Sequence, residues 1–173
     1  MDRFVVLLRG VNLGKHKRIS MPAFRGVLEA VGCTEVQTYV QSGNAVVAWN
    51  GSADRLAAAV RAELTAAAGL DVLVMVRTGA ELAAVVEGNP FAGEVVDPKL
   101  LHVAFLTGPP APDLVAAVDH DALLPDRMVV GERVLYLRYA TGSQNSPLAR
   151  VRLDVEATAR NWRTVTALRD LAG

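Results

Sequence analysis

Two short runs of this sequence combine residue types that bind anions. The first, Arg-Gly-Val-Asn-Leu-Gly at 9–14, follows the first apolar segment, and the second, Arg-Asn-Trp-Arg-Thr at 160–164, precedes the last one. An arginine guanidinium binds phosphate or carboxylate through paired hydrogen bonds, and glycine lets backbone N–H groups approach the same anion. The two runs therefore predict anion binding at the ends of secondary-structure elements, where folds present functional side chains.

A local positive charge surrounds the first run. Residues 4–28 contain five basic side chains and no acidic one, and the polar turn Gln-Ser-Gly-Asn at 41–44 adds amide and hydroxyl groups. If the ends of the elements converge, these groups can hold one anion between them. We expect the ligand to contact Arg9, Gly10, Asn12, Gly14, Ser42, Asn44, Arg160, Asn161 and Trp162.

Several of these residues also have an ordinary structural explanation. Trp162 has the helical spacing with Val165 and Leu168 that is typical of a core anchor, although its ring is also of a type that stacks on a base or sugar. Asn161 is as well suited to capping a helix as to contacting a ligand. The chain has fifteen arginines, so we expect many of them, Arg160 included, to be solvated or paired with acids.

No group of residues completes a catalytic or metal site. Ser42 does not stand in a nucleophile elbow, and Cys33 follows a predicted helix end, where a buried inert thiol is expected. The three histidines, at 16, 102 and 120, fall in a predicted loop, strand and helix without the spacing of a shared base or metal site. Catalytic residues are thus not identified, and no metal or cofactor is predicted.

The composition indicates a compact α/β protein. Of 173 residues, 51% are hydrophobic and 21% charged, and eighteen basic side chains balance eighteen acidic ones. Attraction to nucleic acid or to an acidic surface must therefore be local. The apolar runs fall far short of the roughly 18 residues that span a bilayer, the start lacks a secretory signal pattern, and one cysteine excludes an internal disulfide. We expect a cytoplasmic protein without membrane association, and the oligomeric state stays open.

The first half has the pattern βαββαβ. Residues 4–8 form an unbroken aliphatic run, as in a central strand covered on both faces. Ser20 and Ser52 are placed to cap two helices, with Gly69 ending the second. A hairpin is expected between the helices, and a strand at 72–76 follows them. This order predicts the ferredoxin-like, or split βαβ, unit.

The second half repeats part of this order. Thr78 and Glu81 have the spacing of a capping box, so a further helix is expected through 87, followed by a linker at 89–98. The remaining expected elements are a strand at 101–106, a helix at 113–123, strands at 128–130 and 134–139, a short helix near Leu148 and a terminal helix that includes Trp162. We therefore predict an α+β chain with a ferredoxin-like domain at 1–88 and a related βαββ-plus-helices domain at 99–173.

Five segments together resemble one family. They are the run at 9–14, Met21, the turn at 41–44, Asn-Pro-Phe at 89–91 and Thr-Ala-Arg-Asn-Trp-Arg-Thr-Val-Thr at 158–166. In this order they are similar to the bacterial DUF1697 family, a domain of unknown function, over almost the whole chain. The resemblance implies a fold built from ferredoxin-like βαββ units and implies no established activity.

Two functions from different classes fit these observations. The first is a noncatalytic module that binds a nucleotide, a phosphorylated metabolite or a nucleic-acid backbone. The second is an enzyme that acts on a small phosphorylated or carboxylated metabolite, in which Arg9, Asn12, Asn44 and Asn161 orient the substrate. The first is favoured, because its binding residues are named whereas the enzyme lacks an identified nucleophile or base.

Overall fold

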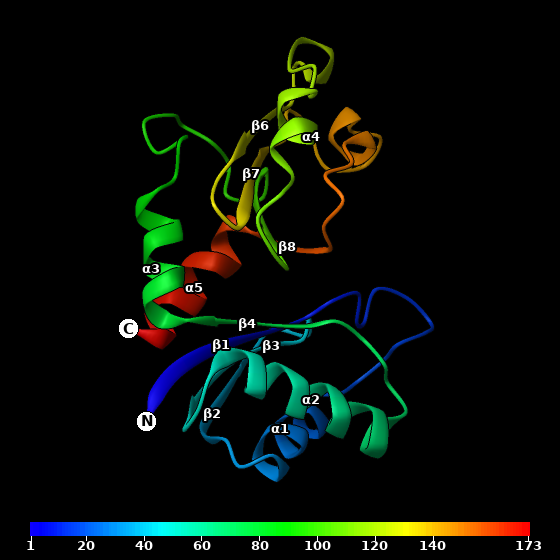
Figure 1. Ribbon diagram of the computed structural model, residues 1–173, viewed down its shortest axis with the longest axis vertical. Helices are drawn as coiled ribbons and strands as arrows, with labels where there is room; N and C mark the ends of the chain where they lie inside the picture. Colours follow the sequence, from blue (N-terminus) through cyan, green and yellow to red (C-terminus); the bar gives the residue numbers. More distant parts are fainter. The chain divides into compact units, whose positions relative to one another are not determined.

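The computed structural model describes residues 1–173. The chain is α+β, with two four-stranded antiparallel sheets and five α-helices (Figure 1). It divides into two compact units, residues 1–84 with 167–173 and residues 85–166. Each unit contains one of the sheets. The domains expected at 1–88 and 99–173 stay a prediction.

The first unit holds the predicted βαββαβ order. Its strands form an antiparallel sheet in the order β2-β3-β1-β4, and α1 and α2 cover one face of that sheet (Figure 1). These elements are β1 (Asp2–Leu8), α1 (Met21–Ala30), β2 (Thr34–Tyr39), β3 (Asn44–Trp49), α2 (Ala53–Ala68) and β4 (Val74–Thr78).

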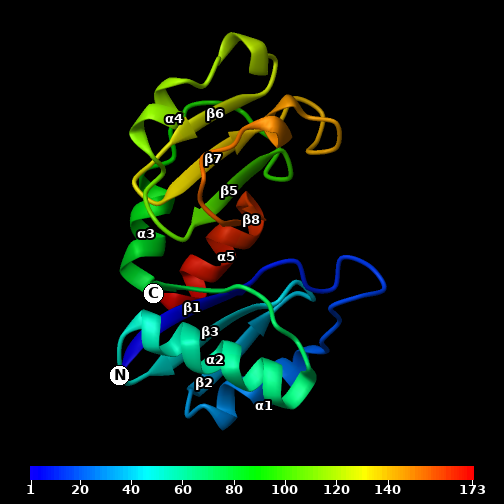
Figure 2. The same cartoon turned by 45° about the vertical axis from the view of Figure 1, so that its right-hand side comes forward.

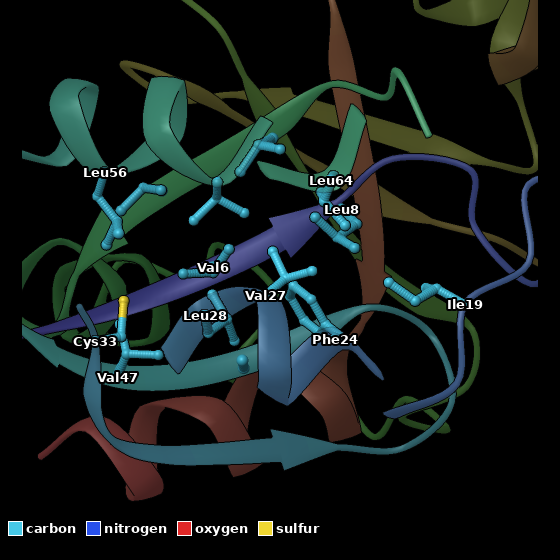
Figure 3. Close-up of a cluster of buried hydrophobic side chains, with 14 of the residues drawn as sticks. Val6, Leu8, Ile19, Phe24, Val27, Leu28, Cys33, Val47, Leu56 and Leu64 are labelled. Carbon is cyan, nitrogen blue, oxygen red and sulfur yellow. The ribbon is translucent and has the colours of Figure 1, made fainter. Parts of the chain in front are cut away.

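Both faces of β1 are buried, as the unbroken aliphatic run predicts. Val6 and Leu8 point into the cluster beneath the two helices, where they meet Phe24 and Leu64 (Figure 3). Their neighbour Leu7, whose side chain points to the other face, is also fully buried. Because neither face meets water, β1 stabilises the sheet through apolar burial on both sides.

The helix boundaries follow the predicted capping residues. The Ser20 Oγ accepts a hydrogen bond from the Ala23 N–H at 3.2 Å, and the Ser52 Oγ accepts one from the Arg55 N–H at 3.3 Å. Gly69 ends α2 in the left-handed conformation, with φ of 63°. Each cap satisfies backbone groups that the helix itself leaves unpaired, which fixes where the helix begins or ends.

The predicted capping box at Thr78 is confirmed. The Thr78 N–H donates to the Glu81 Oε2 at 2.8 Å, and the Glu81 N–H donates to the Thr78 Oγ1 at 3.0 Å. This reciprocal pair begins α3 (Gly79–Glu87) directly after β4.

The second unit has a sheet with the strand order β6-β7-β5-β8, all antiparallel (Figure 2). Its inner strand β5 corresponds in chain order to β1, one of the two inner strands of the first sheet. The elements are β5 (Leu101–Leu106), α4 (Pro112–Ala116), the 3-10 turn η1 (Asp121–Leu123), β6 (Arg127–Val130), β7 (Val134–Arg138), the 3-10 turn η2 (Pro147–Arg150), β8 (Ala157–Asn161) and α5 (Trp162–Ala172).

Two predictions for this half are wrong in detail. The helix expected at 113–123 is broken into α4 and η1, because the Asp119 Oδ1 accepts hydrogen bonds from the Asp121 and Ala122 N–H groups and starts a new turn. The strand β8 was not expected, since Ala-Thr-Ala-Arg-Asn has no apolar run. Residues 157–161 form a strand because they pair with β5, and not because their own side chains favour one.

The end of β1 lies very close to the β2–β3 turn. Gly43 has φ of +71°, and a Cβ added there would lie 2.7 Å from the Val11 Cγ2 and 2.8 Å from the Leu8 Cβ. The Leu8 N–H also donates to the Gly43 carbonyl at 2.9 Å. Only glycine fits this conformation and this approach.

We expect Gly43→Ala to lower the free energy of unfolding by about 2–4 kcal/mol, because it adds overpacking to a left-handed backbone penalty. Urea unfolding followed by circular dichroism measures this. Gly26→Ala is the matched control: Gly26 lies inside α1 with open space around it, so alanine should stabilise by up to about 1 kcal/mol. A Gly43→Ala variant as stable as the parent would contradict the steric explanation.

Candidate functional site

Asn12 organises the loop of residues 9–20 that joins β1 to α1, here called the β1–α1 loop. The Asn12 Nδ2 donates to the carbonyl oxygens of Ile19 and Gln41, each at 2.8 Å, and the Asn12 Oδ1 accepts from the Ile19 N–H at 2.9 Å. Its backbone has φ of 58°, a left-handed conformation that asparagine tolerates better than most residues. One side chain therefore closes the loop on itself and ties it to the β2–β3 turn.

The tip of this loop is exposed and basic. All of residues 13–18 are exposed, and Lys15, Lys17 and Arg18 carry positive charge there without an acidic neighbour in the loop. Arg9 and Gly10 at the start of the loop are also exposed, and the Arg9 N–H is fixed by the Leu73 carbonyl at 3.0 Å. The basic side chains are therefore exposed at the tip of a loop whose base is hydrogen-bonded to the rest of the first unit.

The field of the loop reaches a neighbouring carboxylate. The hydrogen bond and charge of Arg61, 2.7 Å away, lower the pKa of the Asp71 carboxyl, and Lys17 adds a smaller effect in the same direction. Because Asp71 is already paired with Arg61, the positive charge of the loop tip is only partly offset.

The predicted turn residues have different positions. Ser42 and Gly14 are exposed, whereas Asn44 is fully buried as the first residue of β3. The Asn44 Nδ2 donates to the Tyr39 carbonyl at 3.2 Å, which closes the hairpin across its turn. Among the predicted contacts, Asn44 and Asn12 thus both bond to the backbone around the turn.

The second predicted run lies at the junction of β8 and α5. The Asn161 Oδ1 accepts from the Thr164 N–H at 2.9 Å, so Asn161 caps α5, one of the two roles that the sequence left open. Arg160 precedes it in β8, and consecutive strand residues point to opposite faces of a sheet. The Arg160 and Asn161 side chains are therefore not brought together. Trp162 is half-buried at the start of α5.

Arg160 lies in an environment that disfavours its charge. Burial lowers the pKa of the Arg160 guanidinium to about 10, and its Nη1 donates to the Thr158 Oγ1 at 2.8 Å and to the Ala159 carbonyl at 2.9 Å. These contacts hold the guanidinium against its own strand.

The structure brings the six N-terminal candidates together around the β1–α1 loop and the β2–β3 turn, within the first unit. Arg160, Asn161 and Trp162 belong to the second unit. Sequence reasoning missed Gln41, Ile19 and Gly43 as the partners that fix the loop. It also missed the left-handed conformation of Val40 at the start of the turn, with φ of 49°. A β-branched residue rarely adopts this conformation, so its residue type gives no reason to expect it.

No cluster of three or more histidine, cysteine, aspartate or glutamate side chains is arranged to hold a metal ion. The predicted burial of Cys33 is confirmed: it packs in the cluster beneath α1 and α2, and desolvation raises the pKa of its thiol to about 11 (Figure 3). A thiol of this kind is a poor nucleophile. None of the helices has the length and apolar character that crossing a bilayer requires.

The fold and loop define an α+β protein of two antiparallel sheets in which a cationic loop is pinned at its base. The profile of the family described as "Protein of unknown function (DUF1697)" matches residues 1–136, and the chain belongs to this family. It is similar in structure to the conserved bacterial protein SP0830 from Streptococcus pneumoniae, with a TM-score of 0.79 and 20% sequence identity over 99% of this chain and 98% of that one. No curated protein is significantly similar to it.

We expect Asn12→Ala to lower the free energy of unfolding by about 2–4 kcal/mol, since it removes three hydrogen bonds and places alanine at a positive φ. Asn12→Gly removes the same bonds but fits the backbone, so it should cost about 1 kcal/mol less. Urea unfolding of both variants separates the two effects. Equal stability of Asn12→Ala and the parent would show that the loop does not depend on Asn12.

The Cys33 thiol predicts a pH dependence of stability. The pKa of the thiol in the folded state, about 11, lies above the ordinary value of 9.0. The contribution of the protonated thiol to the free energy of unfolding is therefore complete below pH 9 and is lost as the pH rises towards 11. We expect the free energy of unfolding to fall less between pH 9 and 11 in Cys33→Ala than in the parent, as measured by urea unfolding. An identical fall in both proteins would remove Cys33 as a cause.

Proposed function

We propose that this protein is a noncatalytic module that binds an anionic ligand at the β1–α1 loop. The ligand is a nucleotide, a phosphorylated metabolite or a nucleic-acid backbone. One observation carries the proposal: an exposed loop with Lys15, Lys17 and Arg18 at its tip is closed at its base by the hydrogen bonds of Asn12. A preorganised cationic loop loses little conformational freedom when an anion binds, which favours affinity.

Backbone strain in the β2–β3 turn, beside the loop, supports a binding site at this position. Val40 adopts a left-handed conformation that is unfavourable for a β-branched residue, and the residue is 50% exposed. Strain of this kind persists where the surrounding structure imposes it, and it is concentrated at functional sites. We therefore include the β2–β3 turn, with Ser42, in the proposed binding surface.

The finer features of the fold belong to the same proposal. The strand order β2-β3-β1-β4, with α1 and α2 on one face, supports a ferredoxin-like topology for the first unit. Arg160, Asn161 and Trp162 are kept as a second predicted contact, to be tested separately. The single buried cysteine supports a cytoplasmic location.

The proposal predicts that a triple variant, Lys15→Gln with Lys17→Gln and Arg18→Gln, loses anion binding. Thermal shift with ATP, pyrophosphate and short single-stranded RNA, at low and high ionic strength, measures it. A ligand at about 100 times its Kd stabilises the parent by about 2.7 kcal/mol, and high salt should reduce the effect. The triple variant should show no shift.

Arg55→Gln is the matched control, because Arg55 is an exposed cation on α2 away from the loop. It should keep the full shift. If no anion stabilises the parent, or if the triple variant responds as the parent does, the loop is not an anion site. Chemical conversion of a stabilising phosphate ester, followed by phosphorus NMR, would instead favour an enzyme.

A further inference from the structure

A pocket in the second unit has no part in the proposed anion site. It has a volume of about 340 Å³, within the range of small-molecule sites, and lies between α4, η1 and η2. Residues of α4 and of η2 both line it. The side chains that matter for its chemistry are Leu114, Val118, Leu123, Arg150 and Val151.

Apolar packing and hydrogen bonds position η1 and η2 next to the pocket. Leu123 and Leu148 are buried together in one apolar cluster beneath η1 and η2. The buried Asp126 carboxylate accepts hydrogen bonds from the Ser146 Oγ and from the Ala140 N–H, while the Ser146 Oγ accepts from the Leu148 N–H at 3.1 Å. This network fixes the start of η2, the turn that contributes Pro147 and Arg150 to the lining of the pocket.

The walls of the pocket are apolar but incompletely covered. Leu114, Val118 and Val151 are only half-buried, and Ala117 and Ala122 are exposed. Asp119, where the chain turns between α4 and η1, belongs to the lining of the pocket. An apolar chain placed here would remove that surface from water, which is favourable in proportion to the area covered.

Cationic groups stand at one side of the pocket. The Arg150 guanidinium is exposed and is not engaged in an ion pair, whereas the Arg152 Nη1 is held by the carbonyl oxygens of Ala149 and Val151 at 2.7 and 3.1 Å. Asp119, the acid in the lining, accepts from two backbone N–H groups. Arg150 is therefore available for an anion.

We propose that this pocket binds an amphiphilic carboxylate, with its apolar chain against Leu114, Val118 and Leu123 and its head group on Arg150. A mostly apolar lining with an arginine that is free of ion pairs at one side is complementary to an apolar chain that ends in a single anionic group. Apart from Arg150, the charged side chains of the lining, Asp119 and Arg152, are hydrogen-bonded to the backbone, so few polar groups are left to recognise a nucleobase or sugar. This site is separate from the β1–α1 loop and does not depend on it.

Octanoate is the probe, and amide chemical shifts in NMR titrations report where it binds. We expect shifts confined to residues 114–123 and 148–152. Octanol, which has the same chain without the charge, should bind to the parent roughly three- to tenfold more weakly than octanoate does. Octanoate should bind to the Arg150→Gln variant more weakly than to the parent by a similar factor. Arg55→Gln should bind octanoate as the parent does.

Ala122→Phe fills the opening and should remove the shifts, with circular dichroism confirming that the variant folds. Three results would each overturn the proposal. They are the absence of shifts in the pocket, equal affinity for octanoate and octanol with no effect of Arg150→Gln, and shifts only at the β1–α1 loop. The last result would leave the proposed anion site intact, so the two sites are judged independently.

Discussion

The contact of Gly43 with Leu8 and Val11 is the constraint on which the first unit depends. It joins the end of the central strand, the start of the β1–α1 loop and the hairpin turn at one point. Asn12 then closes the loop over this point through Ile19 and Gln41. Because the turn and the loop are fixed by the same contacts, the conformation of each depends on the other, and the cations of the loop lie next to the hairpin turn.

Local signals predicted most of the fold. Ser20, Ser52 and the Thr78–Glu81 pair were identified correctly, because a capping side chain bonds to backbone groups only three residues away. β8 could not be found in this way, since its strand character comes from β5, more than fifty residues earlier. The break at Asp119 is also local, but an aspartate within an amphipathic pattern is equally compatible with an uninterrupted helix.

The sequence predicted where the polar turns lie, but not which atoms their side chains contact. The two N-terminal segments were correctly expected to be polar turns at strand ends, and the structure joins them. However, Asn12, Asn44 and Asn161 each bond to the backbone of their own surroundings. An amide that stabilises a turn and an amide that binds a ligand have the same residue type, so sequence cannot separate them. The distinction requires knowing which carbonyl and N–H groups lie within reach.

The discontinuity of the first unit has a consequence for synthesis on the ribosome. Residues 167–173 belong with residues 1–84, and the Arg3 Nη1 donates to the Leu171 carbonyl at 2.9 Å. A chain that emerges from its N-terminus has the whole β2-β3-β1-β4 sheet available long before that carbonyl is made. The contacts of the first unit with residues 167–173 can therefore form only after the second unit and the end of α5 have been translated.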